Sequence, residues 1–393
     1  MNKQTTRNSI VAAAFLMATS AIGPGFLTQT AVFTEQLLAS FGFVILATII
    51  LDIITQVNIW RIIVVAQRRA QDIANDVFPG LGYILAGLIV FGGLAFNIGN
   101  IAGAGLGIEI LSGFDPRIGA AVSCLLAIGI FSVREAAIAM DWLIKVLGVL
   151  MIALTLYVMW KSTPPLGHAL RETVMPRKID LNAILTLVGG TVGGYITFAG
   201  AHRLIDADIR GLAHVRNASR SAVSAIGLAS VMRTILFLAA LGVVVHGVAL
   251  DPANPAGAVF RIASGEIGYF LFGIVLWCAA ISSVIGAAYT SVSFLKSLHP
   301  ALLANERLLT IAFILVSTLI FTIVGKPVTV LVLAGAVNGL ILPLALTIML
   351  IAAHKQRIVG THYRHPRWLT VLGIAVVILM GYISAEAIRI WLL

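Results

Sequence analysis

Long apolar runs, each about the length of a membrane-crossing helix, dominate the order of hydrophobic and polar positions along this chain. A transmembrane helix needs roughly 20 predominantly apolar residues, and only short polar segments separate the runs here. We expect eleven spans, at residues 9–38, 41–66, 81–112, 117–133, 138–160, 182–204, 219–246, 267–295, 307–325, 328–352 and 368–391. The pattern predicts an all-α integral membrane protein in which residues 1–393 form a single transmembrane domain.

Composition and charge favour the same class. Hydrophobic residues make up 60% of the chain and charged residues only 11%, which leaves too few polar side chains to cover a soluble domain. The basic residues behind the net charge of +10 lie mainly in loops, where they meet anionic lipid rather than nucleic acid. Cys124 and Cys278 both lie inside apolar runs, which excludes a disulfide framework or a CxxC metal site.

The loops also predict an orientation. Lys and Arg are concentrated in alternate loops, and the positive-inside rule then places the N-terminus in the cytoplasm and the C-terminus outside the plasma (inner) membrane. The longest linker, from Lys161 to Asp180, contains Pro164, Pro165 and Pro176, and we expect an extended external loop there.

Two spans contain residues that disfavour a continuous helix. The first span includes the segment 21–30 (AIGPGFLTQT) and the sixth includes the segment 189–197 (GGTVGGYIT). Glycine and proline weaken a helix, and paired interruptions in two halves of a chain mark transporter binding sites. The alternative interpretation is that these glycines only allow close helix packing.

The positions of Gly23 and Gly193 also predict an internal repeat. Each glycine lies in the opening span of one half of the chain. We therefore expect two inverted five-helix repeats, at about 9–160 and 182–352, with the helix at 368–391 appended.

The polar residues near the two breaks are the candidate substrate-binding groups. Open backbone N–H groups at a half-helix N-terminus attract a carboxylate, and neutral side chains can add further hydrogen bonds. Under the alternative interpretation, these side chains only satisfy backbone groups that the breaks release. The candidates are Thr28, Gln29, Thr30 and Thr34 in the first span, and Gly193, Gly194, Tyr195 and Thr197 in the sixth.

Arg233 lies near the middle of the seventh span. An arginine at that depth costs about 2.5–3.5 kcal/mol on insertion scales, so it should face a cavity or a partner. Its guanidinium group suits a carboxylate. Two interpretations are open: Arg233 binds an anionic substrate, or it pairs with Asp52, with Glu35 or with backbone carbonyls for purely structural reasons.

Three further positions bear on coupling. Asn97 and Asn100 share one face of the third span; their amides cannot relay protons, and they either bond across helices or contact substrate. Asp52 is the buried carboxylate that we expect to couple transport to H⁺ or Na⁺, and Glu35 is a second acidic candidate. We expect no cofactor, and the histidines are too scattered to predict a metal site.

These residues carry a resemblance to a known family. The segments 23–27 (GPGFL) and 188–192 (VGGTV), Ser282-Ser283 and the stretch 331–346 resemble the Nramp family of divalent-metal transporters over about residues 20–352. The resemblance implies the LeuT-like fold of the APC superfamily and transport by alternating access. It also implies a small-molecule substrate and a lipid bilayer as partner. We expect no enzymatic activity, because the sequence shows no nucleophile–base pair or metal cluster. We expect no nucleic-acid partner, and a monomer is plausible.

The family's metal-binding residues are nevertheless missing from the matching positions. Its Asp-Pro-Gly-Asn motif aligns with residues 34–37 (TEQL), and its Met-Pro-His motif aligns with residues 193–195 (GGY). Its third-helix carboxylates align with Asn97 and Asn100, a tenth-helix glutamine with Gly335, and a seventh-helix asparagine with the neighbourhood of Arg233. Because divalent cations need anionic or imidazole ligands, the fold carries over but the metal site does not.

Three functions remain open. The first is a symporter for a small organic acid or amino-acid-like solute. The chain resembles a branch of the family whose genes often accompany genes for 5-oxoproline breakdown, and this resemblance makes 5-oxoproline the named candidate. The second is transport of Mn²⁺ or Mg²⁺ by a rebuilt site, in which Glu35 serves as a ligand if the helix register shifts by one residue. The third is a membrane protein that does not transport, and the lack of a soluble domain disfavours it.

Overall fold

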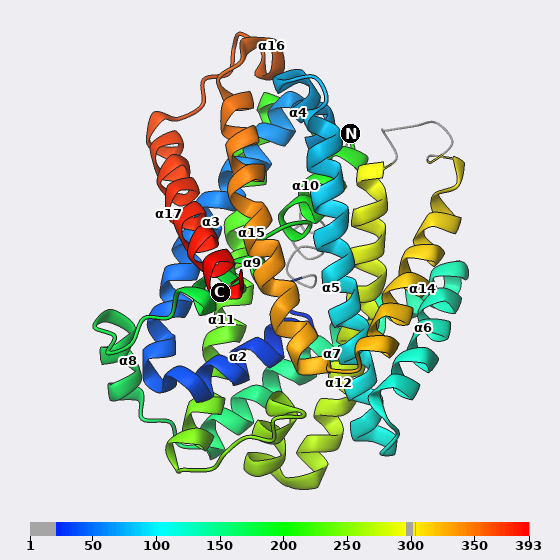
Figure 1. Cartoon of the computed structure of the whole chain (residues 1–393), viewed down its shortest axis with the longest axis vertical. Helices are drawn as coiled ribbons and strands as arrows, with labels where there is room; N and C mark the ends of the chain where they lie inside the picture. The colour runs from blue at the N-terminus through cyan, green and yellow to red at the C-terminus, as the bar shows by residue number, and fades with distance from the viewer. Residues whose placement is uncertain (1–20, 296–301, 303, 393) are drawn as a thin grey trace.

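Helices account for all the regular structure in the described part of the chain, which comprises residues 21–295, 302 and 304–392 of a computed structural model. Figure 1 shows α3, α5, α15 and α17 running roughly along the long axis of the molecule, whereas α2 lies across it. In chain order the α-helices are α2 (Pro24–Leu37), α3 (Phe41–Ala66), α4 (Ala70–Val77), α5 (Leu81–Ser112), α6 (Pro116–Ser132), α7 (Arg134–Lys161), α8 (Leu166–Val174), α9 (Leu181–Thr191), α10 (Ile196–Asp206), α11 (Val215–Val245), α12 (Pro255–Leu295), α14 (Glu306–Val324), α15 (Pro327–Ala353), α16 (Gln356–Val359) and α17 (Arg367–Leu392); short 3₁₀ turns are η1 (Leu38–Ser40) and η2 (Leu212–His214).

Helix ends follow local sequence signals. The α5 helix stops at Gly113, whose φ of 74° suits a residue without a side chain. Asp115 then caps the next helix by accepting from the backbone N–H of Arg117, with Pro116 in the first turn. Asp180 caps α9 in the same way through the N–H of Ala183. Most of the observed helix boundaries lie within a few residues of the predicted spans.

The described residues include eight helical segments that are long and apolar enough to cross a membrane, or nine if α7 and α8 form one bent span. The predicted total of eleven stays a prediction: this count joins α2 and α3 into one segment (Pro24–Ala66) and leaves out the shorter α6, and most of the first half of span one lies outside the described residues. The two inverted repeats and the orientation of the termini also remain predictions.

The linker from Lys161 to Asp180 differs from the expected extended loop. Its two adjacent prolines do end α7, but the residues after them form α8, which is bent by 106° from the course of α7. Helix formation is favoured because one face of α8 packs on the rest of the protein, where Ala169 and Glu172 are buried.

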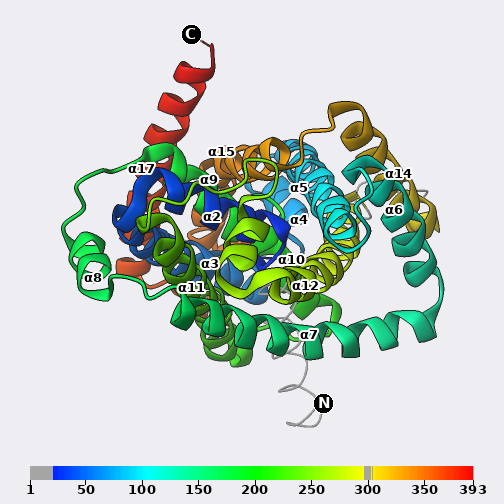
Figure 2. The ribbon, with the colours of Figure 1, turned by 90° about the horizontal axis from the view of Figure 1, so that it is seen from below.

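The innermost segment runs through α9 and α10, whose apolar core is wholly buried. It packs against α2, α3, α12 and α15. Figure 2, which looks along the bundle, shows α7 crossing its outside, with α8, α6 and α14 at the periphery. An interruption in the innermost segment therefore lies at the centre of the protein.

Candidate functional site

The sixth span is broken at its centre. Residues 192–195 separate α9 from α10, and Gly194 has a φ of +49°. A side chain at Gly194 would overlap Asn338 of α15, since a Cβ there would lie 1.5 Å from Asn338 Oδ1. Asn338 is itself held by hydrogen bonds to the carbonyls of Gly92 and Ala334. Glycine is thus required both for the backbone turn and for the close approach of α15.

The first span is interrupted at Ile22 and Gly23, directly before α2. Gly23 has an extended backbone, and a Cβ on it would lie 3.1 Å from Ser283 Oγ and 3.5 Å from Asn100 Oδ1. The break therefore faces α5 and α12. Residues 34–37, which the resemblance aligns with the family's broken-helix motif, instead form the last turn of the continuous helix α2.

Arg233 of α11 lies against both breaks. Its Nη1 donates a 2.9 Å hydrogen bond to Oγ1 of Thr191, the last residue of α9. Its guanidinium carbon lies 4.2 Å from the ring centroid of Phe26, in the first turn of α2. Arg233 is only 3% exposed, and within the described chain its Nε and Nη2 atoms have no hydrogen-bond partner. Two donor atoms are therefore available at the junction of the broken helices.

Asp52 of α3 is the acidic residue that interacts with Arg233. The two side chains attract each other electrostatically, and Asp52 also faces Thr191. Asp52 is buried, and its Oδ1 has no hydrogen-bond partner among the residues that the structure describes. We call Phe26, Asp52, Thr191 and Arg233 the arginine cluster.

A second group of polar side chains lies between the breaks and α5. The Tyr195 side chain faces Asn100, and its ring packs edge-on against Phe96. In the described structure, Tyr195 Oη, Asn100 Nδ2 and Ser283 Oγ all lack a hydrogen-bond partner. Asn97, by contrast, donates a 3.1 Å hydrogen bond to Ser317 of α14, which matches the interpretation that it bonds across helices.

The remaining candidates divide into satisfied and unsatisfied side chains. Thr30 and Thr34 donate to the carbonyls of Phe26 and Thr30 within α2, and Thr28 is buried in the same helix. Gln29 donates to the carbonyl of Leu331 in α15, while its Oε1 lacks a partner within the described residues.

Thr197, at the start of α10, donates a 3.4 Å hydrogen bond to Oε1 of Gln56 in α3. Because Asp52 and Gln56 are one turn apart, α3 presents polar groups on both sides of the break: Asp52 near the end of α9 and Gln56 near the start of α10. This face of α3 therefore spans the gap between the two half-helices.

Glu35 does not lie at either break. It is exposed at the end of α2, where its Oε1 accepts a 2.8 Å hydrogen bond from the backbone N–H of Leu250. A shift of one residue in register would not bring it to the interruption at Gly23, so the rebuilt metal site with Glu35 as a ligand is not supported. No group of three or more His, Cys, Asp or Glu side chains able to hold a metal occurs in the described residues.

Sequence reasoning missed Asn338 and Gln56, and it did not foresee that Thr191 and Phe26 contact Arg233. Asn338 is an isolated amide in a very apolar span, and such a residue in a membrane usually faces the bundle interior. That signal was available. The pairing of Gln56 with Thr197 depends on how α3 lies across α10, which no local pattern reveals.

A polar network links the helices at one end of the bundle. Arg69, which precedes α4, pairs with Asp206 at the end of α10, and Asp206 also accepts from the hydroxyl of Tyr289 on α12. Just inside it, buried His202 accepts from the backbone N–H of Ala70 at Nε2 and contacts Ser293 Oγ at 3.1 Å through Nδ1. The network joins three elements around the half-helix α10.

An all-helical membrane domain with interrupted helices meeting at a buried polar centre defines the LeuT-like class of transporters. Solved structures of that class match nearly the whole chain. A mutant of the manganese transporter from Eremococcus coleocola superposes with a TM-score of 0.74 at 16% identity, covering 98% of this chain and 88% of that one. MhsT in complex with L-phenylalanine gives a TM-score of 0.65 at 18% identity, covering 96% and 98%.

The chain belongs to the Nramp family, since the family model for natural resistance-associated macrophage protein-like proteins matches residues 14–388. It is also 57% identical to an uncharacterized membrane protein of Haemophilus influenzae, covering 97% of this chain and 96% of that one. Its identity to the uncharacterized membrane protein YcsG of Bacillus subtilis is likewise 57%, covering 95% and 92%. The protein is therefore a membrane transporter of the Nramp family.

Proposed function

We propose that this Nramp-family protein is a secondary active transporter that carries a small organic acid or amino-acid-like solute by alternating access. The named candidate is 5-oxoproline, and the coupling ion is H⁺ or, alternatively, Na⁺. Asp52 and Glu35 are the acidic residues proposed for coupling. Asp52 is buried beside the breaks, whereas Glu35 lies at the exposed end of α2.

The observation that supports this proposal is the position of Arg233 between the two broken helices, with two donor atoms unsatisfied among the described groups. A buried donor without a partner costs about 1–3 kcal/mol, and more when it is charged. A carboxylate satisfies both donors at once in the fork geometry that guanidinium favours. An anionic solute thus supplies what this part of the protein lacks.

The arginine cluster also favours a solute that carries an N–H group. Asp52 Oδ1 is a buried acceptor without a partner in the described structure, and an amine or lactam N–H of the solute would satisfy it. The lactam ring of 5-oxoproline combines this donor with a carboxylate. The same molecule can therefore bind both charged side chains.

A divalent cation, Mn²⁺ or Mg²⁺, is the second candidate, and family membership favours it. At about 5 Å and an effective dielectric constant of about 20, Arg233 would oppose such an ion by roughly 6 kcal/mol. Asp52 at a similar distance offsets no more than a comparable amount. The arginine cluster then provides no net attraction for a cation.

Uptake by purified protein in vesicles tests the proposal. Wild-type protein should accumulate radiolabelled 5-oxoproline saturably, and Arg233→Ala should reduce kcat/KM for uptake by roughly tenfold or more, the equivalent of a charge-assisted hydrogen bond. Arg216→Ala, at the exposed start of α11, is the control. Saturable entry of Mn²⁺ that no organic acid inhibits would contradict the proposal.

The role of the N–H group has its own test. The lactone analogue of 5-oxoproline has a ring oxygen where the lactam has N–H, and it is otherwise the same size. Wild-type protein should favour the lactam by about fivefold or more, equal to about 1 kcal/mol for one hydrogen bond, and Asp52→Asn should reduce that preference. Equal transport of both compounds would remove Asp52 from substrate recognition but leave Arg233 in place.

A further inference from the structure

The α8 helix has three distinct faces. Successive residues of a helix are about 100° apart, so Leu166, Leu170 and Val174 fall on one stripe. Ala169 and Glu172 fall on another face, and both are buried. His168 and Arg171 occupy the third, polar face. A helix on a water-exposed surface has only two faces, one buried and one polar. The α8 helix has a third face, which is apolar and exposed.

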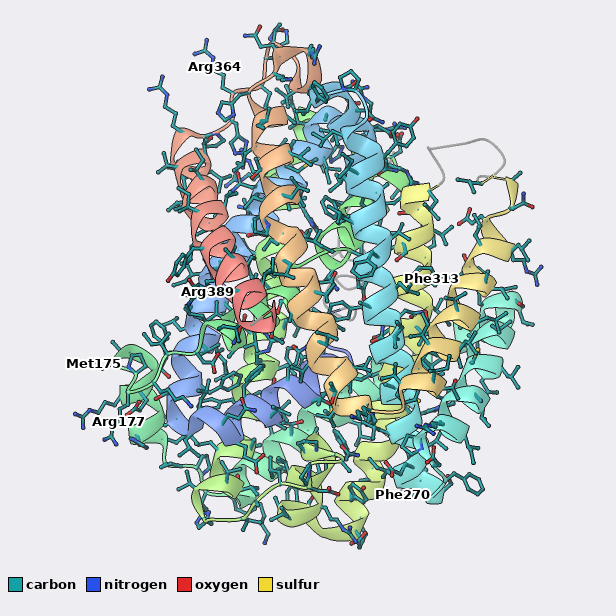
Figure 3. The ribbon with its side chains drawn as sticks, in the orientation of Figure 1. Met175, Arg177, Phe270, Phe313, Arg364 and Arg389 are labelled. Atoms are coloured by element: carbon teal, nitrogen blue, oxygen red, sulfur yellow. The ribbon has the colours of Figure 1, made fainter. Side chains whose placement is uncertain are left out.

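The apolar stripe is exposed. Leu166 is 55% exposed, Leu170 70% and Val174 71%, and the apolar residues Met175 and Ile179, which follow the helix, are exposed as well. Figure 3 shows Met175 and Arg177 at the outer edge of the molecule, away from the bundle. Single exposed apolar residues are common, but a continuous stripe on a short helix indicates a surface that water does not cover.

The position of α8 identifies what covers this stripe. The helix follows directly after the end of α7, where Tyr157 and Trp160 are exposed, and aromatic residues of this kind gather at the boundary between acyl chains and headgroups. Its 106° bend from α7 turns it away from the course of that membrane helix. An amphipathic helix with such a position lies in the plane of the bilayer surface.

Basic side chains flank the same stripe. Arg171 lies on the polar face of α8, and Lys178 follows the helix; both are exposed. Arg177 is committed to an ion pair with Glu172. Cations beside an apolar stripe match the chemistry of an acidic phospholipid, whose chains meet the stripe while its phosphate meets the cations.

The buried face of α8 joins this surface to the broken first span. Glu172 Oε2 accepts a 2.6 Å hydrogen bond from Ser40 in η1, the turn between α2 and α3. The neighbouring Thr173 packs closely on Gly42 of α3: a Cβ added to Gly42 would lie 2.2 Å from Thr173 Oγ1. The helix is thus fixed to the corner at which α2 ends.

We propose that α8 is a lipid-binding anchor, which inserts its apolar stripe into the bilayer boundary and binds acidic phospholipid headgroups through Arg171 and Lys178. It thereby holds the α2–α3 corner at the bilayer surface. This anchor is independent of the solute that the transporter carries.

The depth of the stripe is measured with a nitroxide label on Leu170→Cys, in full-length protein whose buried Cys124 and Cys278 are replaced by alanine. In phosphatidylcholine bilayers the label should be accessible to oxygen and shielded from a water-soluble nickel complex. The control label on His168→Cys, on the polar face of the same helix, should show the reverse. Equal access of the nickel complex to both labels would mean that lipid does not cover the stripe.

The headgroup preference is measured with a fluorophore on Met175→Cys and quencher-labelled phosphatidylglycerol or phosphatidylcholine. Each basic residue near an anionic surface changes partitioning by roughly fivefold, so Arg171→Gln with Lys178→Gln should reduce the preference for phosphatidylglycerol by about tenfold or more. Arg216→Gln with Arg220→Gln, an equal loss of two charges on the exposed surface of α11, should leave it unchanged. Equal quenching by both lipids in the wild type would overturn the headgroup assignment, and a second copy of the chain would then be the alternative occupant.

Discussion

Among single residues, Gly194 and Asn338 show how tightly the broken sixth span is held. The glycine adopts a left-handed conformation, and its backbone touches the Asn338 amide, which donates to the carbonyl of Gly92 in α5 and to that of Ala334 in its own helix. The break is therefore built into the packing of α5, α9 and α15 and is more than a weak point in a helix.

Substitution at this position should be costly. Gly194→Ala places a methyl group 1.5 Å from Asn338 Oδ1 and adds left-handed backbone strain, so we expect a loss of about 2–4 kcal/mol in stability. Thermal unfolding in detergent measures it. Gly227→Ala, where no atom lies within 4 Å of the added methyl group, should be neutral or stabilising because alanine favours a helix. Equal melting temperatures for the two variants would show that the Asn338 side chain moves to accommodate the added methyl group.

At the scale of elements, the sequence predicted the helices and the breaks far better than their neighbours. Runs of apolar residues define spans regardless of tertiary context, and the glycines at 193 and 194 mark the central break. By contrast, the prolines at 164 and 165 favoured a loop, because the pattern cannot show that Glu172 finds Ser40 across the fold. The alignment of residues 34–37 with the family's broken-helix motif could not be checked from the sequence either: only the structure shows that the interruption lies at Ile22 and Gly23, whereas Glu35 lies at the exposed end of α2.

The candidate site was predictable in part. Arg233 was identifiable because an arginine in mid-span is rare and costly, and the structure places it in contact with Thr191 and Phe26 beside the two breaks. Its direct partners were not foreseen, since Thr191 and Phe26 contact it through the crossing of α11 over α2 and α9. Roles for these residues in transport remain proposals.

The linker before α17 offers an element-scale prediction about pH. Buried His365 contacts Tyr363 Oη and Asn58 Oδ1, each at 2.9 Å, and so ties the linker to α3. Burial, with help from Arg61 and His354, lowers the pKa of His365 to about 4. As pH falls from about 6.5 to about 4, the unfolded chain gains a proton that the native His365 does not, so stability should fall by up to about 3 kcal/mol.

The measurement compares thermal unfolding of wild type and His365→Asn between about pH 7 and pH 4.5. The variant should lose less stability over this range, because asparagine does not titrate. His362→Asn, which removes an exposed histidine from the same linker, should behave as the wild type does. Parallel curves for wild type and His365→Asn would show that the native histidine titrates normally.

For the whole molecule, we expect the network of Arg69, Asp206 and Tyr289 to hold one end of the bundle closed. It joins the start of α4, the end of α10 and α12. Opening this end requires that these contacts separate, since α10 is one half of the broken span.

Asp206→Asn should therefore favour the open arrangement. A cysteine introduced at buried Thr290 reports access, and we expect its modification by a water-soluble maleimide to accelerate roughly fivefold, equivalent to about 1 kcal/mol for a partly exposed ion pair. Asp208→Asn removes a surface ion pair with Arg210 only two residues away and is the matched control. Identical rates in both variants would show that this network does not limit opening.

The opposite charges of Asp52 and Arg233 determine how the membrane potential acts on the transport cycle. Moving one elementary charge across about 100 mV requires about 2.3 kcal/mol. Because the two buried charges cancel, the return of the empty carrier moves no net charge and requires no such work. If the proposed acid travels with one proton, the loaded carrier is neutral at its centre as well. The rate of such a cycle would depend on the concentration gradients of the solute and of protons, and it would hardly change with the electrical potential.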